Sequence, residues 1–226
     1  MNISKPRTIH TILFLAFTLA LTAVTPLVAS RVQSQGKTDS FEYSIQGDKD
    51  QSVYVTVGVN MDDEHSRQKY IDANKQRGYE LIANKQNEHI PVQITFASPI
   101  SIHEVRKLVE STNFDVEEFL LVGHSTISQE RGTHIQFSSL DVPIPERELI
   151  DPNSGEEIVF EGIMVLKGQV VATNAGLGKW LADERVYLVD TSKVELLEIL
   201  GKEHMNKIAG KEVEISIPSP FWNLDW

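Results

Sequence analysis

Residues 90–126 read IPVQITFASPISIHEVRKLVESTNFDVEEFLLVGHST, and this stretch indicates the fold class. At its centre, Ser101-Ile102-His103-Glu104 is a capping box, in which the serine and glutamate side chains satisfy backbone N–H groups at a helix start. The box predicts a helix over 102–112. The apolar face of that helix consists of Ile102, Val105, Leu108 and Val109. Residues 90–96 and 116–126 are rich in β-branched and aromatic side chains, so the stretch predicts a strand–helix–strand unit.

Further strands and helices are predicted on both sides of this unit. Strands are expected over 53–57, 79–83, 133–140, 158–171, 186–189 and 213–217. Helices are expected over 62–77 with Gly78 as C-cap, over 174–183, and from a second capping box at 192–195. This order predicts an α+β fold with mainly antiparallel sheets and helices on one face, and a ferredoxin-like split βαβ arrangement fits it.

One segment has a counterpart in a known family. Residues 177–190 read LGKWLADERVYLVD, and these fourteen residues resemble the last helix and strand of subtilisin-type propeptide inhibitor domains. The resemblance implies a related, ferredoxin-like fold. As a function, it implies slow inhibition of subtilisin-type proteases.

The N-terminus has the features of an export signal. Lys5 and Arg7 precede residues 8–30, which contain no Lys, Arg, Asp or Glu and predict an apolar leader helix. Because positive flanks stay inside, everything after residue 30 is expected outside. A signal peptidase would find small or modest side chains at Val28-Ala29-Ser30. Alternatively, a segment of this length is enough for an uncleaved anchor, which needs about 20 residues. We therefore expect an exported protein that is secreted or anchored at the outer face of the cytoplasmic membrane.

The exported part divides by composition. Residues 31–51 are polar and predict a flexible spacer. The Pro- and Gly-containing stretch 142–157 predicts a linker loop. It would separate an α+β subdomain at 52–141 from a second one at 158–226, and the two subdomains could also pack as one domain.

Charge and cysteine content exclude several classes of function. The net charge is −11, and it becomes −13 when Lys5 and Arg7 leave with the leader. Nucleic acids and anionic membranes attract Lys and Arg, so neither is expected as a partner of the exported part. Membrane contact is expected only through residues 8–30, if they are retained. The chain has no cysteine, which excludes disulfides and thiolate chemistry, and no cofactor is predicted.

Two histidines give the strongest metal candidate. His124 and His134 flank a predicted hairpin, and Glu130 lies in its turn. Imidazole and carboxylate are zinc ligands, and a catalytic zinc site needs three protein ligands. A metal-assisted hydrolase is therefore one hypothesis. Histidines that face solvent across the strands are the alternative.

The acidic run Asp62–His65 also has two interpretations. It suggests either a binding site for a hard cation or the first turn of a helix.

The C-terminal residues 218–226, PSPFWNLDW, are aromatic. Phe221, Trp222 and Trp226 are interaction candidates, because aromatic residues dominate interface energetics. The other interpretation has this tail folding back over a sheet edge or core. Because no catalytic motif is found, the leading hypothesis is an exported, non-enzymatic binding module. Its partner would be a protein or an envelope component, bound through a sheet face or the tail. A metal-assisted hydrolase and a propeptide-like inhibitor are the alternatives.

Overall fold

The computed structural model describes residues 32–47, 52–126, 131–138, 140, 148–150, 157–218 and 220. Within them the chain forms two sheets with helices packed against them, so the predicted α+β class is confirmed. The predicted leader helix at 8–30 lies outside the described residues. In the described ranges, no helix combines the length and the hydropathy needed to cross a membrane.

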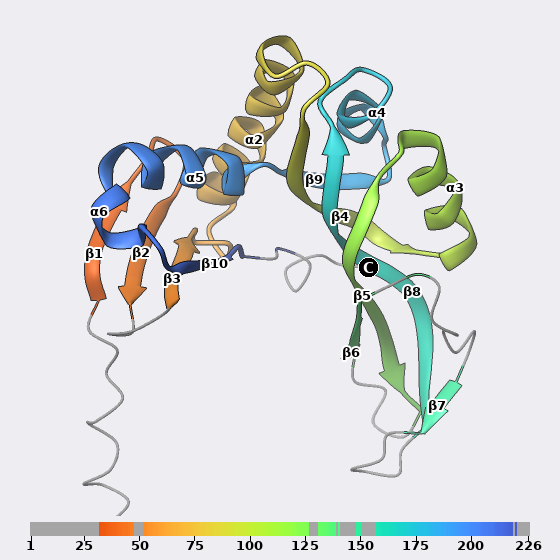
Figure 1. The fold of residues 1–226 in the computed structure, drawn as a ribbon. Coiled ribbons are helices and arrows are strands. Elements are labelled where there is room, and N and C mark those ends of the chain that lie inside the picture. Colours follow the sequence, from red (N-terminus) through yellow and green to blue (C-terminus); the bar gives the residue numbers. More distant parts are fainter. Residues whose placement is uncertain are drawn as a thin grey trace, which may run out of the picture.

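The smaller sheet has four strands in the order β1-β2-β3-β10. Its strands are β1 (Val32–Lys37), β2 (Glu42–Gly47), β3 (Ser52–Gly58) and β10 (Glu212–Ser216). Neighbours pair antiparallel except β10, which runs parallel to β3. Alternate residues of β3 are buried, namely Val53, Val55 and Val57. They form a core with Leu196 and Leu200 of helix α5 (Ser192–Glu203). Figure 1 shows α5 and the short α6 (Met205–Ile208) beside these strands.

The larger sheet has the strand order β6-β5-β8-β4-β9, with β7 added to β8, and every described pairing in it is antiparallel. Its strands are β4 (His89–Ile100), β5 (Asp115–Ser125), β6 (Arg131–Phe137), β7 (Glu148–Ile150), β8 (Glu157–Val171) and β9 (Val186–Asp190). Helices α3 (Ile102–Thr112) and α4 (Leu177–Ala182) pack against it. Trp180 of α4 is buried there, in ring contact with Phe96 and Phe114.

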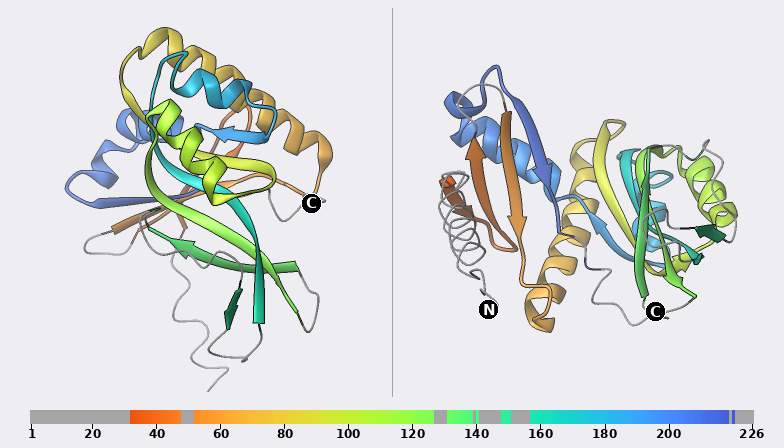
Figure 2. Two further views of the ribbon diagram at one scale, coloured as in Figure 1. Left: turned by 90° about the vertical axis from the view of Figure 1, so that its right-hand side faces the viewer. Right: turned by 90° about the horizontal axis from the view of Figure 1, so that it is seen from below.

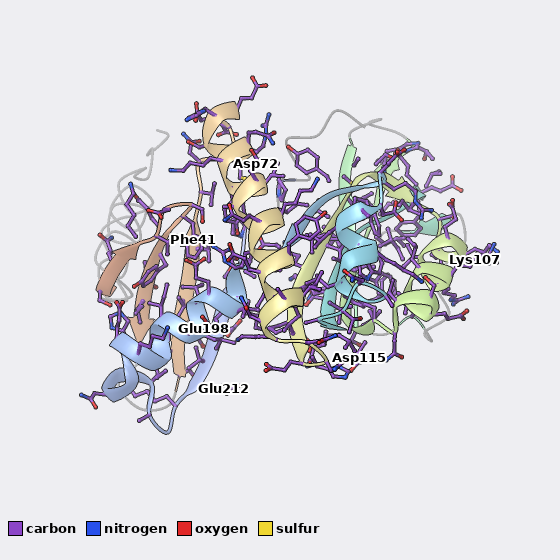
Figure 3. The ribbon with its side chains drawn as sticks, turned by 90° about the horizontal axis from the view of Figure 1, so that it is seen from above. Phe41, Asp72, Lys107, Asp115, Glu198 and Glu212 are labelled. Atoms are coloured by element: carbon purple, nitrogen blue, oxygen red, sulfur yellow. The ribbon has the colours of Figure 1, made fainter. Side chains whose placement is uncertain are left out.

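Helix α2 (Glu64–Asn84) joins the two halves of the molecule. Its Tyr70 belongs to the core of the four-stranded sheet, whereas its Leu81 belongs to the core of the larger sheet. Figure 2 (right) shows α2 between the two sheets. Seen from above in Figure 3, α2 with Asp72 lies between the strands around Phe41 and the elements around Lys107 and Asp115.

The division of the chain differs from the prediction. The predicted spacer at 31–51 contains β1 and β2, which are strands of the four-stranded sheet. The predicted boundary at 142–157 does not separate two units, because β5 pairs with β8 across it and β3 pairs with β10. Instead, the larger sheet is inserted between α2 and α5. Pairing partners far apart in sequence leave no local signal, so composition alone misplaced the division.

Two local predictions were also wrong. The strand predicted over 79–83 is the last part of α2, which continues through Gly78. The second predicted capping box does not form, because α5 begins after Thr191 without a side-chain cap. By contrast, the first capping box is present at α3, where the Ser101 hydroxyl accepts a hydrogen bond from the Glu104 N–H at 3.3 Å.

Candidate binding surface

The four-stranded sheet has one face that the described helices leave open. Strand pairing places Gln35, Ser44, Thr56 and Ser216 in one row across it. The neighbouring row contains Gln46, Tyr54 and Glu214. These rows alternate with the buried valines of β3, so their side chains lie on the face away from α5. We call this surface the open face.

Two hollows adjoin the open face. The first has a volume of about 480 Å³ and lies over β1, β2 and β3, with Gln35, Ser44 and Thr56 in its lining. The second, of about 460 Å³, extends toward the start of α2 and is lined in part by Asn60 and Lys69. Lys37, Glu42 and Gly58 line both hollows, so the two hollows adjoin each other at this end of the sheet.

The open face carries an exposed aromatic ring among acidic side chains. Tyr54 is 47% exposed, and Glu214 lies directly opposite it on β10. Glu212 is exposed two residues earlier on the same strand. The Lys37 ammonium binds the Glu42 carboxylate at 2.9 Å. Glu212 and Glu214 form no ion pair with the residues that the structure describes, and Glu214 lines a further hollow with Lys193. The face therefore suits a partner with positive charge.

A second polar cluster lies in the interior, where β9 leads into α5. The Asp190 carboxylate accepts hydrogen bonds from the Tyr70 hydroxyl at 2.6 Å and the Ser192 hydroxyl at 2.5 Å. Burial raises the pKa of the Asp190 carboxyl, and the hydrogen bonds from Ser192 and Tyr70 oppose this change. Burial also raises the pKa of Tyr70 well above its usual value. Tyr70, Asp190 and Ser192 have no exposed surface. We therefore assign the cluster to structure and not to catalysis on a diffusing substrate.

The predicted metal ligands are only partly described. His124 Nδ1 lies 2.7 Å from Glu161 Oε1, which is a carboxylate partner that the sequence did not indicate. The backbone of His134 lies opposite Val122 on the neighbouring strand, while its side chain and Glu130 lie outside the described residues. Within the described part of the chain, no group of three His, Asp or Glu side chains is placed to hold a metal ion.

Two other predicted sites have different outcomes. The acidic run at 62–65 caps the start of α2, because the Asp63 carboxylate accepts a hydrogen bond from the Ser66 N–H at 2.7 Å. Hydrogen bonding from the Ser66 side chain, and then from this N–H, lowers the pKa of Asp63. Phe221, Trp222 and Trp226 lie outside the described residues. Just before them, the Pro218 carbonyl accepts a hydrogen bond from the buried Gln93 side chain at 3.3 Å.

Sequence reasoning missed most of the open face. The alternation of Val213, Ile215 and Ile217 with polar residues did indicate a half-exposed strand at β10. The polar composition of 31–51 concealed β1 and β2, which supply half of the strands. Their signal is a short alternation at 41–45, where Phe41, Tyr43 and Ile45 are buried.

Comparison with known proteins adds no family to these observations. No family model matches the sequence, and no match was found among the curated proteins or the solved structures.

Proposed function

We propose that this chain is an exported, non-enzymatic binding module that holds a protein partner on the open face. The observation that carries the proposal is the asymmetry of the four-stranded sheet. One face is packed against α2 and α5, while the other presents rows of polar side chains beside the hollow over β1, β2 and β3. The predicted leader at 8–30 supports an extracytoplasmic location, either secreted or anchored at the membrane.

The chemistry of the open face favours a basic segment of the partner. A Lys or Arg side chain over the Tyr54 ring would gain roughly 0.5–1 kcal/mol from a cation–π contact at an exposed site. Glu214 on the adjacent strand lies within reach of the same cation, because directly paired strand residues are about 5 Å apart. The strongly negative net charge of the chain would also steer a basic partner toward it.

We further propose that the larger sheet and its helices form a ferredoxin-like split βαβ unit. Its elements follow the order β4-α3-β5-β8-α4-β9. The strands lie in the order β5-β8-β4-β9, with antiparallel neighbours. This order supports the classification, and β6 and β7 are then additions between the second and third strands. The propeptide-like inhibitor remains an alternative on this fold, and absence of subtilisin inhibition at micromolar protein would end it.

The test of the binding proposal is a selection from a random peptide display library. We expect the wild-type protein to enrich peptides rich in Lys and Arg. These peptides should lose binding to a Tyr54→Ser/Glu214→Lys variant. The matched control is Glu110→Lys, which makes the same charge change at an exposed position of α3. Enrichment without basic residues, or equal binding to both variants, would contradict the proposal.

The enzymatic alternative has its own measurement. If His124 and His134 held a catalytic zinc ion, elemental analysis of the purified protein would find stoichiometric zinc. This zinc would be lost in a His124→Ala/His134→Ala variant. That result would replace the non-enzymatic proposal, whereas we expect no stoichiometric metal.

A further inference from the structure

The chain passes from one half of the molecule to the other at Asp190, Thr191 and Ser192. Asp190 ends β9 of the larger sheet, and Ser192 begins α5, which packs on the four-stranded sheet. All three residues are completely buried. The carboxylate of Asp190 receives three hydrogen bonds, from the Tyr70 hydroxyl, the Ser192 hydroxyl and the Ser192 N–H at 2.9 Å.

Helix α2 holds this junction with a second buried side chain. The Asn74 amide oxygen accepts hydrogen bonds from the Thr191 N–H at 2.8 Å and the Thr191 hydroxyl at 3.2 Å. The Asn74 amide nitrogen donates to the Tyr70 carbonyl at 3.1 Å. Tyr70 and Asn74 are one turn apart on α2. One face of this helix therefore binds the three residues that connect the two halves.

Within the part of the chain that the structure describes, the Asp190 carboxylate accepts hydrogen bonds from neutral donors only, namely Tyr70 and Ser192. On α2, the cation whose charge acts on Asp190 is Arg77, and it forms its ion pair with Glu195 of α5. On α5 the groups next to the carboxylate are the neutral hydroxyl and N–H of Ser192. On β4 the paired residue is Gln93, which is neutral. Arg77 lowers the pKa of Asp190 through its charge, as the last of several causes that begin with burial. A buried carboxylate without direct neutralisation is costly when ionised.

The surrounding hydroxyl groups can accommodate a proton on this carboxyl. A protonated Asp190 would donate to the Tyr70 hydroxyl oxygen. Tyr70 would then donate to the Ser192 hydroxyl, which lies 3.0 Å away. Ser192 would keep donating to the other carboxyl oxygen. Every hydrogen bond of the cluster has a donor and an acceptor in this state, and the buried charge is gone.

We propose that Asp190 is a proton-dependent clasp, which takes up one proton from an acidic medium and thereby strengthens the junction between the two sheets. The direction of the pH dependence of stability follows from the raised pKa of Asp190. A carboxyl whose pKa is raised in the folded protein retains a proton that the unfolded chain has released. Its stabilising contribution is complete below the ordinary value of 3.8 and is lost as the pH rises through the raised value.

The test compares the free energy of unfolding of the wild-type protein and an Asp190→Asn variant across acidic and neutral pH. The amide does not titrate, so wild-type stability should fall relative to the variant as the pH rises. Between the two pKa values, the unfolding equilibrium constant should change by up to about tenfold per pH unit. The matched control is Asp72→Asn on the exposed side of α2, which should leave the pH profile unchanged.

A direct titration keeps the inference testable if Asp190→Asn fails to fold. Carbon-13 NMR of the Asp190 carboxyl in the wild-type protein should give a midpoint above 3.8. Amide-exchange protection of β9 and α5, corrected for intrinsic rates, should rise as this group is protonated. A midpoint at or below the ordinary value would overturn the proposal, as would parallel pH profiles of the wild-type protein and the Asp190→Asn variant.

Discussion

Ser101 and Ser192 show how one residue type acquires two roles from its surroundings. Both stand at a helix start with a glutamate three positions later, so the sequence predicted a capping box at each. At Ser101 the prediction holds, because the hydroxyl oxygen accepts the Glu104 N–H at 3.3 Å and also donates to Glu104 Oε2 at 2.7 Å. Ser192 instead donates to Asp190, and Glu195 pairs with Arg77. Ser192 thus bonds to a residue just before the helix, while tertiary packing brings Arg77 to Glu195, and the capping-box pattern reveals neither partner.

The cap at α3 gives the prediction at this scale. Ser101→Ala removes the acceptor of the Glu104 N–H and should lower the free energy of unfolding by about 1 kcal/mol. Ser101→Asp keeps a capping oxygen and serves as the control, with a much smaller loss. Urea unfolding measures both, and equal stability of the alanine variant and the wild-type protein would show that the cap contributes nothing.

For α2, the sequence predicted the correct type of element but ended the helix too early, at residue 77. Its buried residues are Tyr70, Asn74, Gly78 and Leu81, which have helical spacing. Only two of these four are apolar, so hydrophobic periodicity stops early and Gly78 resembles a C-cap. The structure uses the glycine for close packing, since a Cβ there would lie 2.8 Å from Leu181 Cδ1 of α4. Helices with a clear apolar face, such as α3, were predicted correctly.

A pair of glycine substitutions tests this packing. Gly78→Val should destabilise the protein by about 1–3 kcal/mol, because the added methyl groups push against Leu181. Gly201→Ala in α5 adds a methyl group with nothing within 4 Å, so the gain in helix propensity should stabilise the protein by roughly 0.5–1 kcal/mol. Thermal and urea unfolding report both changes. A stabilising Gly78→Val would contradict the close approach of α2 and α4.

At the scale of the whole molecule, the sequence predicted the α+β class and most individual strands but not their assembly. The four-stranded sheet is built from both ends of the described chain, and the parallel pairing of β10 with β3 adds its last strand. Such pairing depends on contacts between distant segments, which composition does not encode. The open face was missed for the same reason, since its rows exist only after β1, β2, β3 and β10 have come together.

Truncation of the C-terminus tests whether the residues after Ile217 contribute to the stability of the fold. Ending the chain after Ile217 removes the Pro218 carbonyl and leaves the Gln93 amide, which is 3% exposed, without this partner. This loss should cost about 1–3 kcal/mol. Ending it after Ser219 keeps the carbonyl, so the two truncations together separate this bond from the contribution of Phe221, Trp222 and Trp226. A loss confined to the shorter chain would leave the three aromatic residues free for a partner, and an equal loss would assign them to the fold.

The binding role of the open face is tested most directly by NMR mapping on the labelled protein, with a basic peptide from the display selection as the probe. We expect chemical-shift changes along β1, β2, β3 and β10, including those of Tyr54, Thr56 and Glu214, and weaker binding as the salt concentration rises. Changes confined to the larger sheet, or none at saturating peptide, would contradict it.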